Sequence, residues 1–339
     1  MKWRLLLVPP MVALIVAALW WRGPEWGTVA DVFTAVSWWW IVAAVALNLA
    51  SVVARAIAWR AVVAQALPQT PKFVYIFSAF SIGLLANAVL PARAGELARV
   101  AVLRRHLEPG RGYTATLLGT VFMHRLFDTV PALLLVVYTL NTAKIPHWAI
   151  TALIIAAGIA LVLIAAALFV SRLRRPVQEE LSSIRRVLAM ARLGLEVLRS
   201  PVAAAVALTF QCIGWLLQLL AVWVTMRAFE IDAPLPAAAV VLLLMNVATI
   251  FPLWPGNIGL LQAAVALPLV SYGVPYARGF AYGLGLQVLE MSVGVGVGLV
   301  FLAREGMTFA TLKRMREETQ PDVPVEALRE AEPARARSA

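Results

Sequence analysis

The residues most capable of chemistry in this chain are charged and amide side chains that interrupt long apolar runs. The first group lies in the segment Asn87 to Arg99, NAVLPARAGELAR, where Arg93, Glu96 and Arg99 surround a break made by Pro91 and Gly95. An ionisable group placed in hydrocarbon costs on the order of several kcal/mol unless it pairs or meets water. These side chains are therefore predicted to bind a ligand.

An anion is the ligand that this segment suits best. Arg93 stands at the break itself, and its planar guanidinium can hold a lipid phosphate through two N–H donors. A helix beginning near Gly95 would add the positive end of its dipole. Glu96 and Arg99 are three residues apart and are expected to pair on one helical face. The alternative is that the arginines, Arg99 above all, only extend to cytoplasmic headgroups.

A second charged group lies inside an apolar run, in the sequence HRLFD from His124 to Asp128. Arg125 and Asp128 are three residues apart and can neutralise each other. A purely structural pair and a ligand-binding role are alternatives for Asp128, because intramembrane charge pairs often only hold helices together. His124 is predicted to be a hydrogen-bonded packing residue, since three scattered histidines give no metal-site spacing.

A third segment, FPLWPGNIGLLQ, concentrates helix breakers and is followed by polar residues in the next apolar run. Its prolines would end one half-helix, and the exposed N–H groups of its turn would suit an anion or a headgroup. A packing kink explains less well why four breakers cluster. The alternative for Glu290 is a structural role, in which its carboxyl group is hydrogen-bonded in the core beside the glycines that follow it. The residues singled out here are Pro252, Pro255, Gly256, Asn257, Gly259, Gln287 and Glu290.

The elements that carry these residues are membrane helices. The 339 residues are 62% hydrophobic and 14% charged, and the mean hydropathy is +0.83, so lipid must be the solvent. The longest polar stretches, 171–200 and 304–339, are too short to bury a nucleotide-binding core. The single Cys212 excludes a disulfide framework, and no metal or cofactor motif is present. The composition thus argues against a soluble enzyme.

Charge determines the predicted topology. The net charge of +11 comes from basic residues beside apolar spans, which indicates anionic lipid headgroups and not nucleic acid. The run 5–21 follows Lys2 and Arg4 and lacks a signal-peptide cleavage site, so we interpret it as a first span. If every apolar run were a simple crossing, the arginine-rich stretch 92–112 would lie outside, which the positive-inside rule disfavours.

A re-entrant hairpin at 73–106 removes this conflict, and the broken segment 237–272 is predicted to form a second one. The predicted fold is thus an all-α polytopic membrane protein with about six transmembrane helices, two re-entrant hairpins and both termini cytoplasmic. Residues 1–305 form the membrane domain, and residues 306–339, rich in Pro, Glu and Ala, form a disordered cytoplasmic tail.

The two halves of the membrane domain are predicted to be an inverted repeat. Asn87, Pro91 and Gly95 precede a helix with Arg125 and Asp128, whereas Asn246, Pro252 and Gly256 precede a helix with Gln287 and Glu290. Gly95 and Arg125 are 30 residues apart, and Gly256 and Gln287 are 31 apart. Paired, interrupted segments at corresponding positions indicate a transporter's midplane site.

The motifs NAVLPARAGELAR, HRLFD and PLWPGNIG resemble the flippase-like membrane domain of lysylphosphatidylglycerol synthases, over roughly residues 5–305. The resemblance implies two re-entrant segments and a role in moving or handling lipids, including aminoacylated phosphatidylglycerol and lipid-linked sugars. It implies roles for Asn87, Pro91, Arg93, Gly95, Glu96, Arg99, Arg125, Asp128, Pro255, Gly256 and Gly259.

The chain departs from this family at positions that bear on the substrate. The family commonly has glutamate at His124, glycine at Asn257, glutamate at Gln262 and arginine near Gln287. A second site with fewer charges disfavours a generic aminoacyl-lipid substrate. The short polar segments also leave no soluble aminoacyltransferase domain, so this chain is not expected to make lysyl-lipid itself.

Three functions remain open on these observations. The first is a flippase-like transporter in the inner membrane that escorts an anionic, aminoacylated or glycosylated headgroup, without cofactor or metal. The second is a membrane subunit of a glycosyl or aminoacyl transferase, with Glu96 or Asp128 as general base and a separately encoded enzyme as partner. The third is a channel, although breaks with paired charge are not rings or filters.

Overall fold

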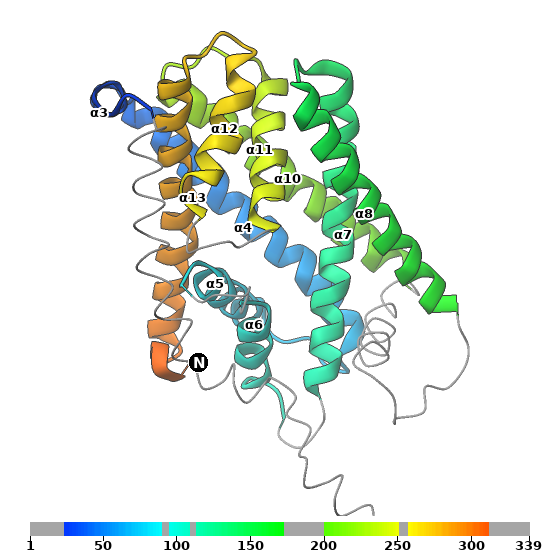
Figure 1. Cartoon of the computed structure of the whole chain (residues 1–339). Coiled ribbons are helices and arrows are strands. Elements are labelled where there is room, and N and C mark those ends of the chain that lie inside the picture. Colours follow the sequence, from blue (N-terminus) through cyan, green and yellow to red (C-terminus); the bar gives the residue numbers. More distant parts are fainter. Residues whose placement is uncertain (1–23, 90–94, 109–112, 173–199, 251–256, 312–339) are drawn as a thin grey trace, which may run out of the picture.

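The computed structural model describes residues 24–89, 95–108, 113–172, 200–250 and 257–311. Within these ranges every regular element is an α-helix. The helices are α3 (Trp26–Thr34), α4 (Trp38–Ala66), α5 (Phe73–Val89), α6 (Gly95–Arg104), α7 (Tyr113–Thr142), α8 (His147–Arg172), α10 (Pro201–Ala228), α11 (Leu235–Ile250), α12 (Leu260–Val270) and α13 (Tyr276–Arg304) (Figure 1).

Five of the described helices, α4, α7, α8, α10 and α13, are long and apolar enough to cross a membrane. Their number confirms the prediction of an all-α, polytopic membrane protein. The further span predicted at 5–21 lies outside the described residues, as do positions 312–339 of the predicted tail.

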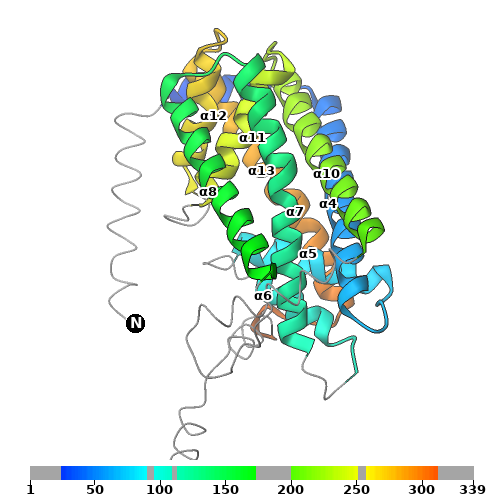
Figure 2. The same ribbon diagram turned by 90° about the vertical axis from the view of Figure 1, so that its right-hand side faces the viewer.

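Five of the described helices, α3, α5, α6, α11 and α12, are too short to cross alone. The longest of them, α5, has 17 residues and extends about 26 Å at 1.5 Å per residue, against a hydrocarbon core of about 30 Å. α5 packs against α6, and α11 packs against α12. The two short pairs lie at opposite ends of the molecule in both views (Figures 1 and 2). They coincide with the segments predicted as hairpins, whose breaks at 90–94 and 251–256 are not described.

The helix bounds recur along the chain at a constant spacing. Adding 162 to the bounds of α4, α5 and α7 gives 200–228, 235–251 and 275–304, whereas α10, α11 and α13 span 201–228, 235–250 and 276–304. The packing is reciprocal as well, because α5 contacts α13 and α7 contacts α11. Each half therefore has the order long, short, short, long.

The two halves meet where α4 lies antiparallel to α10 (Figure 2). The Ser37 N–H donates to the carbonyl of Ala228 at 3.0 Å, and the Ser51 hydroxyl donates to the carbonyl of Gly214 at 2.8 Å. Gly214 permits this approach, since a Cβ there would lie 2.8 Å from Cγ of Arg55. Small residues thus bring the centres of the two helices together, as is usual in membrane proteins.

Candidate functional site

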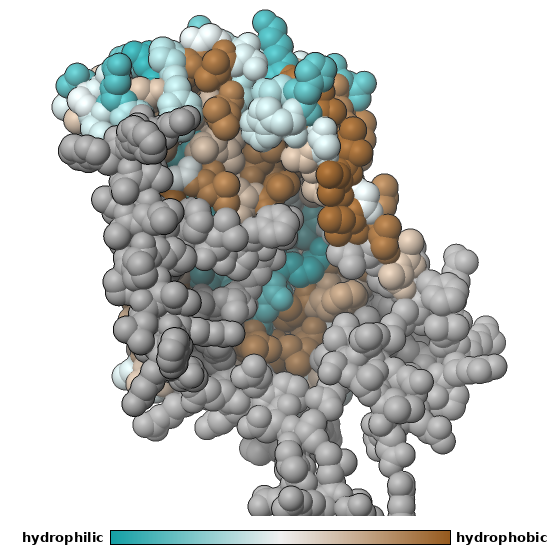
Figure 3. Space-filling view, viewed as in Figure 1, coloured by the Kyte–Doolittle hydropathy of each residue, from teal (hydrophilic) through white to brown (hydrophobic). Residues whose placement is uncertain are grey.

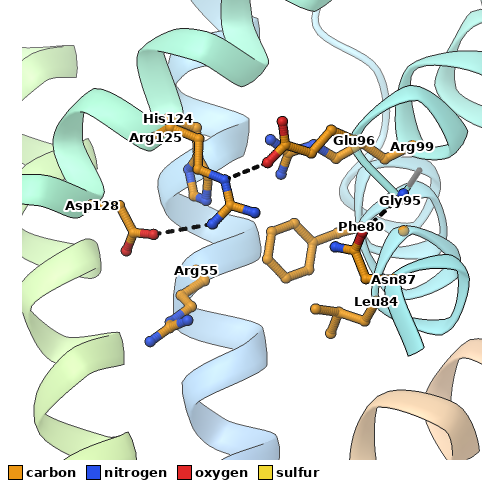
Figure 4. A pocket seen from close by; sticks show the side chains of 11 residues that line it. Arg55, Phe80, Leu84, Asn87, Gly95, Glu96, Arg99, His124, Arg125 and Asp128 are labelled. Carbon is orange, nitrogen blue, oxygen red and sulfur yellow. Dashed lines mark hydrogen bonds and ion pairs between the residues drawn. The ribbon is translucent and has the colours of Figure 1, made fainter. Parts of the chain in front are cut away.

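A pocket lies where α4, α5, α6 and α7 converge, and it collects most of the residues that the sequence singles out in the first half of the chain (Figure 4). It is lined by Arg55, Phe80, Gly83, Leu84, Asn87, Gly95, Glu96, Arg99, His124, Arg125 and Asp128.

Close packing of α5 against α6 positions the residues of the pocket. α6 begins at Gly95, as predicted, and the Gly95 N–H donates to Oδ1 of Asn87 at 2.9 Å. A Cβ at Gly95 would lie 2.0 Å from the carbonyl oxygen of Gly83, so only glycine fits this crossing. The contact places Glu96 and Arg99, one turn apart on α6, beside α7.

The carboxylate of Glu96 binds a residue of α7 and not its neighbour on α6. Nε of Arg125 donates to Oε1 of Glu96 at 2.7 Å, and Nη1 of Arg125 lies 3.3 Å from Oδ2 of Asp128 (Figure 4). The pair of Arg125 and Asp128 is confirmed. The predicted pair of Glu96 and Arg99 is wrong, because α7 presents a second guanidinium at closer range than the one on the same helix.

Asp128 connects this ion pair to the second half of the chain. Its Oδ1 accepts hydrogen bonds from Nε1 of Trp215, at 2.6 Å, and from the amide of Gln211, both on α10. The carboxylate therefore has three donors from two helices, one of them a guanidinium, which offsets the cost of its burial.

Arg99 is buried and does not extend to headgroups, so that interpretation is wrong for this residue. Only 5% of its surface is exposed, and its guanidinium carbon lies 4.9 Å from the ring centre of Trp59 and 5.8 Å from that of Phe80. Nε and Nη2 of Arg99 are buried without a hydrogen-bond partner among the described residues. His124 is also buried, and its Nδ1 has no such partner, contrary to the predicted hydrogen bond.

A second polar chain crosses from α4 to α13. The guanidinium of Arg55 donates to the amide oxygen of Gln218, and Nε2 of Gln218 donates to Oε1 of Glu290 at 3.1 Å. Arg55 also lies over the ring of Trp215, 5.6 Å from its centre. Glu290 thus has a partner in the core, as the alternative for this residue foresaw, but that partner is a neutral amide.

The charged residues in these two series of hydrogen-bonded side chains lie near the middle of their helices. Asp128 is the sixteenth of 30 residues in α7, and Glu290 is the fifteenth of 29 in α13. Arg55 is the eighteenth of 29 in α4. Each side chain therefore starts within about 5 Å of the midpoint of a membrane-spanning helix, measured along its axis.

The polar residues of the second half do not line the pocket. The Asn257 amide donates to the carbonyl of Ala248 at 3.0 Å, and Nε2 of Gln262 donates to Oε1 of Gln287 at 2.5 Å. The Gly259 N–H donates to Oε1 of Gln262 at 2.6 Å. The N–H of Gly259 therefore caps α12 and is not available as a donor for the anion that was predicted to bind at this turn.

Five predicted residues lie outside the described residues: Pro91, Arg93, Pro252, Pro255 and Gly256. Sequence reasoning missed Arg55, Gln211, Trp215 and Gln218, of which Arg55 carried a usable signal. An arginine in the middle of an apolar span is costly and marks a functional candidate in its own right. The amides and the indole carried no comparable signal.

The fold and the pocket define a multi-pass helical membrane protein with charged residues inside its membrane-spanning region. The family model described as the lysylphosphatidylglycerol synthase TM region matches residues 3–298, and the chain belongs to this family. Comparisons with curated proteins and with solved structures find no match. Family and spans together show a membrane protein related to lipid handling.

Proposed function

We propose that this protein is a flippase-like transporter of the cell's inner membrane, which moves a polar lipid headgroup across the bilayer while the acyl chains stay in lipid. The main support for this proposal is that three charged residues, Arg55, Asp128 and Glu290, lie near the midpoints of membrane-spanning helices. Charges at such a depth are costly, and in membrane proteins they mark substrate pathways.

Access from the side supports a lipid substrate. The side chains of Arg125 and Glu96 are 45% and 32% exposed, and Arg125 is the thirteenth of 30 residues in the membrane-spanning helix α7. On the face shown in Figure 3, hydrophilic residues gather in a hollow halfway down, with hydrophobic residues above and below. Apolar side chains of α7 and α8, such as Leu134 and Ile154, are exposed, and in a membrane they would face lipid. A headgroup would enter such a hollow without its tails leaving hydrocarbon.

The proposal includes an inverted repeat with two re-entrant hairpins. The shift of 162 residues between helix bounds, the reciprocal contacts and the antiparallel packing of α4 on α10 support it. Repeats of this kind allow one half to rock against the other, which exposes a central site alternately to the two sides. In this arrangement both chain termini face the cytoplasm.

Reconstitution in liposomes tests the proposal. Anionic, zwitterionic and aminoacylated lipids with a fluorescent headgroup are incorporated, and dithionite quenching measures how fast each headgroup changes sides. We expect faster movement with the wild-type protein, and loss of this acceleration with Glu96→Gln and Arg125→Gln.

Arg104→Gln is the matched control, because Arg104 is an exposed residue of α6 that does not line the pocket. It should retain the wild-type rate. If no headgroup moves faster than in protein-free liposomes, unassisted transport is contradicted, and a role that requires a separately encoded lipid-modifying enzyme is favoured instead.

A further inference from the structure

Arg99 is the one pocket arginine of the described structure that makes no ion pair or hydrogen bond through its buried Nε and Nη2 atoms. Arg125 is bound to two carboxylates, and Arg55 donates to an amide. Leaving a charged group buried without partners costs free energy, and the cost is recovered when a ligand supplies the acceptors.

The surroundings of Arg99 hold its guanidinium in one place. Its guanidinium lies over the neighbouring rings of Trp59 and Phe80. Trp59 is itself fully buried and held by a hydrogen bond from Nε1 to Oγ1 of Thr120 at 3.2 Å. Phe80 is packed edge-on against His124, with ring centres 5.9 Å apart. A donor held by rigid aromatic neighbours loses little entropy on binding.

Among the described residues, the charges that line the pocket leave an excess of one positive charge. Three arginines face two carboxylates, Glu96 and Asp128, and both carboxylates are already bound to Arg125. Glu290, the nearest further acid on α13, is not among the lining residues. Among the described residues neither Arg55 nor Arg99 has a carboxylate partner, but Arg55 donates to the amide of Gln218, whereas Arg99 makes no hydrogen bond through Nε and Nη2. The excess charge is therefore available to a ligand at Arg99, and a second cation entering the pocket would add to it.

We infer that this pocket binds a phosphodiester monoanion, supplied by a lipid headgroup without a cationic group, and that Arg99 is its principal donor. A guanidinium presents two parallel N–H groups that match two non-bridging phosphate oxygens. Nδ1 of His124, also buried in the pocket wall without a partner among the described residues, can supply a further hydrogen bond. An ammonium on the headgroup would meet only carboxylates that are already engaged.

This inference rests on the proposed function for its lipid source, but it concerns binding and not movement. It is tested in detergent micelles by native mass spectrometry, with lipids of identical acyl chains. We expect phosphatidylglycerol to bind wild type about tenfold more tightly than phosphatidylethanolamine or lysylphosphatidylglycerol, because the ammonium groups of the latter two would add to the excess positive charge of the pocket. Equal binding of all three would overturn the inference without any mutation.

Single substitutions test whether the lipid binds in this pocket. Arg99→Gln should weaken phosphatidylglycerol binding by about tenfold or more and abolish the preference over the other headgroups. Arg104→Gln, which removes a positive charge from the same helix outside the pocket, should change neither. A preference that survives in Arg99→Gln, or that both variants lose equally, would show that the net charge of the protein, and not this pocket, selects the lipid.

Soluble competitors separate a lipid from a free anion. We expect glycerophosphoglycerol and inorganic phosphate to leave phosphatidylglycerol bound at equal concentration, because they lack the tails that keep a headgroup at the hollow. Displacement by either would overturn the lipid source. If the lipid binds selectively but liposomes show no acceleration, the proposed transport fails and the inference stands. Acceleration that is equal for all headgroups and independent of Arg99 would contradict the inference alone.

Discussion

Arg125 and Glu96 lie on different helices, 29 residues apart, and Nε of Arg125 donates to Oε1 of Glu96 at 2.7 Å. This ion pair joins the second helix of the first short pair, α6, to a long membrane-spanning helix. The same guanidinium also binds Asp128, so a single side chain links three charges of the pocket. If α6 moves against α7, this ion pair must either break or be maintained by a matching movement of the two side chains.

Glu96→Gln should leave the protein folded and slow headgroup movement. Because both side chains are partly exposed, the pair contributes only about 0–1 kcal/mol to stability. We expect a small change in the midpoint of thermal unfolding in detergent and a large loss of transport in liposomes. Unfolding of the variant at much lower temperature would instead give the pair a mainly structural role.

Asp128→Asn should destabilise the protein more strongly than Glu96→Gln. Asp128 is less exposed and accepts hydrogen bonds from Arg125, Trp215 and Gln211, which tie α7 to α10. Loss of the carboxylate charge weakens all three bonds and costs about 2 kcal/mol. Denaturant-induced unfolding in mixed micelles measures the difference. Equal stability of Asp128→Asn and wild type would contradict the role of Asp128 as a link between the halves.

Arg99→Met should leave the stability unchanged or raise it, in contrast to the replacement of Asp128. Methionine retains an apolar stem beside Trp59 and Phe80 and removes a buried charge whose Nε and Nη2 have no partner among the described residues. Replacing buried ionic groups by apolar side chains is often neutral or stabilises the fold by about 1–4 kcal/mol. Thermal unfolding in lipid-free detergent is the measurement. A large loss of stability would mean that the guanidinium has a structural partner and is not reserved for a ligand.

Gly298→Ala should separate α5 from α13, whereas Gly296→Ala on the same helix should not. A Cβ at position 298 would lie 2.4 Å from Cβ of Leu85 and 2.8 Å from the carbonyl oxygen of Ser81. At position 296 it would meet no atom within 4 Å. We expect Gly298→Ala to cost about 1–3 kcal/mol of unfolding free energy. Gly296→Ala should be neutral or stabilise by up to about 1 kcal/mol. Equal effects would contradict the packing of this interface.

The inverted repeat predicts that the loops before α5 and α11 face opposite sides of the membrane. Gln69 lies in the first loop and Asp232 in the second, and both side chains are exposed. Single cysteines at these positions, in a Cys212→Ser background, should react with a membrane-impermeant maleimide from opposite sides of intact cells or inverted vesicles. Labelling of both from the same side would rule out the inverted arrangement.

Much of the fold could be predicted from local sequence. Hydropathy and the length of apolar runs predict five of the spans, because in lipid every helix must satisfy its backbone within itself. The short helix pairs follow from the clustered Pro and Gly, since proline removes a backbone donor. The charges of Arg125 and Asp128 were recognisable because their cost in hydrocarbon does not depend on tertiary structure.

What the sequence by itself determined is therefore which side chains lie at membrane depth, and what the tertiary structure decided is which of them meet. Glu96 binds Arg125, 29 residues away, in preference to Arg99, because the crossing of α5 and α6 at Gly83 and Gly95 turns α6 toward α7. Arg99 is left without a carboxylate partner for the same reason. A side chain's depth depends on its own helix, whereas its partners depend on how several helices pack, which no local pattern encodes.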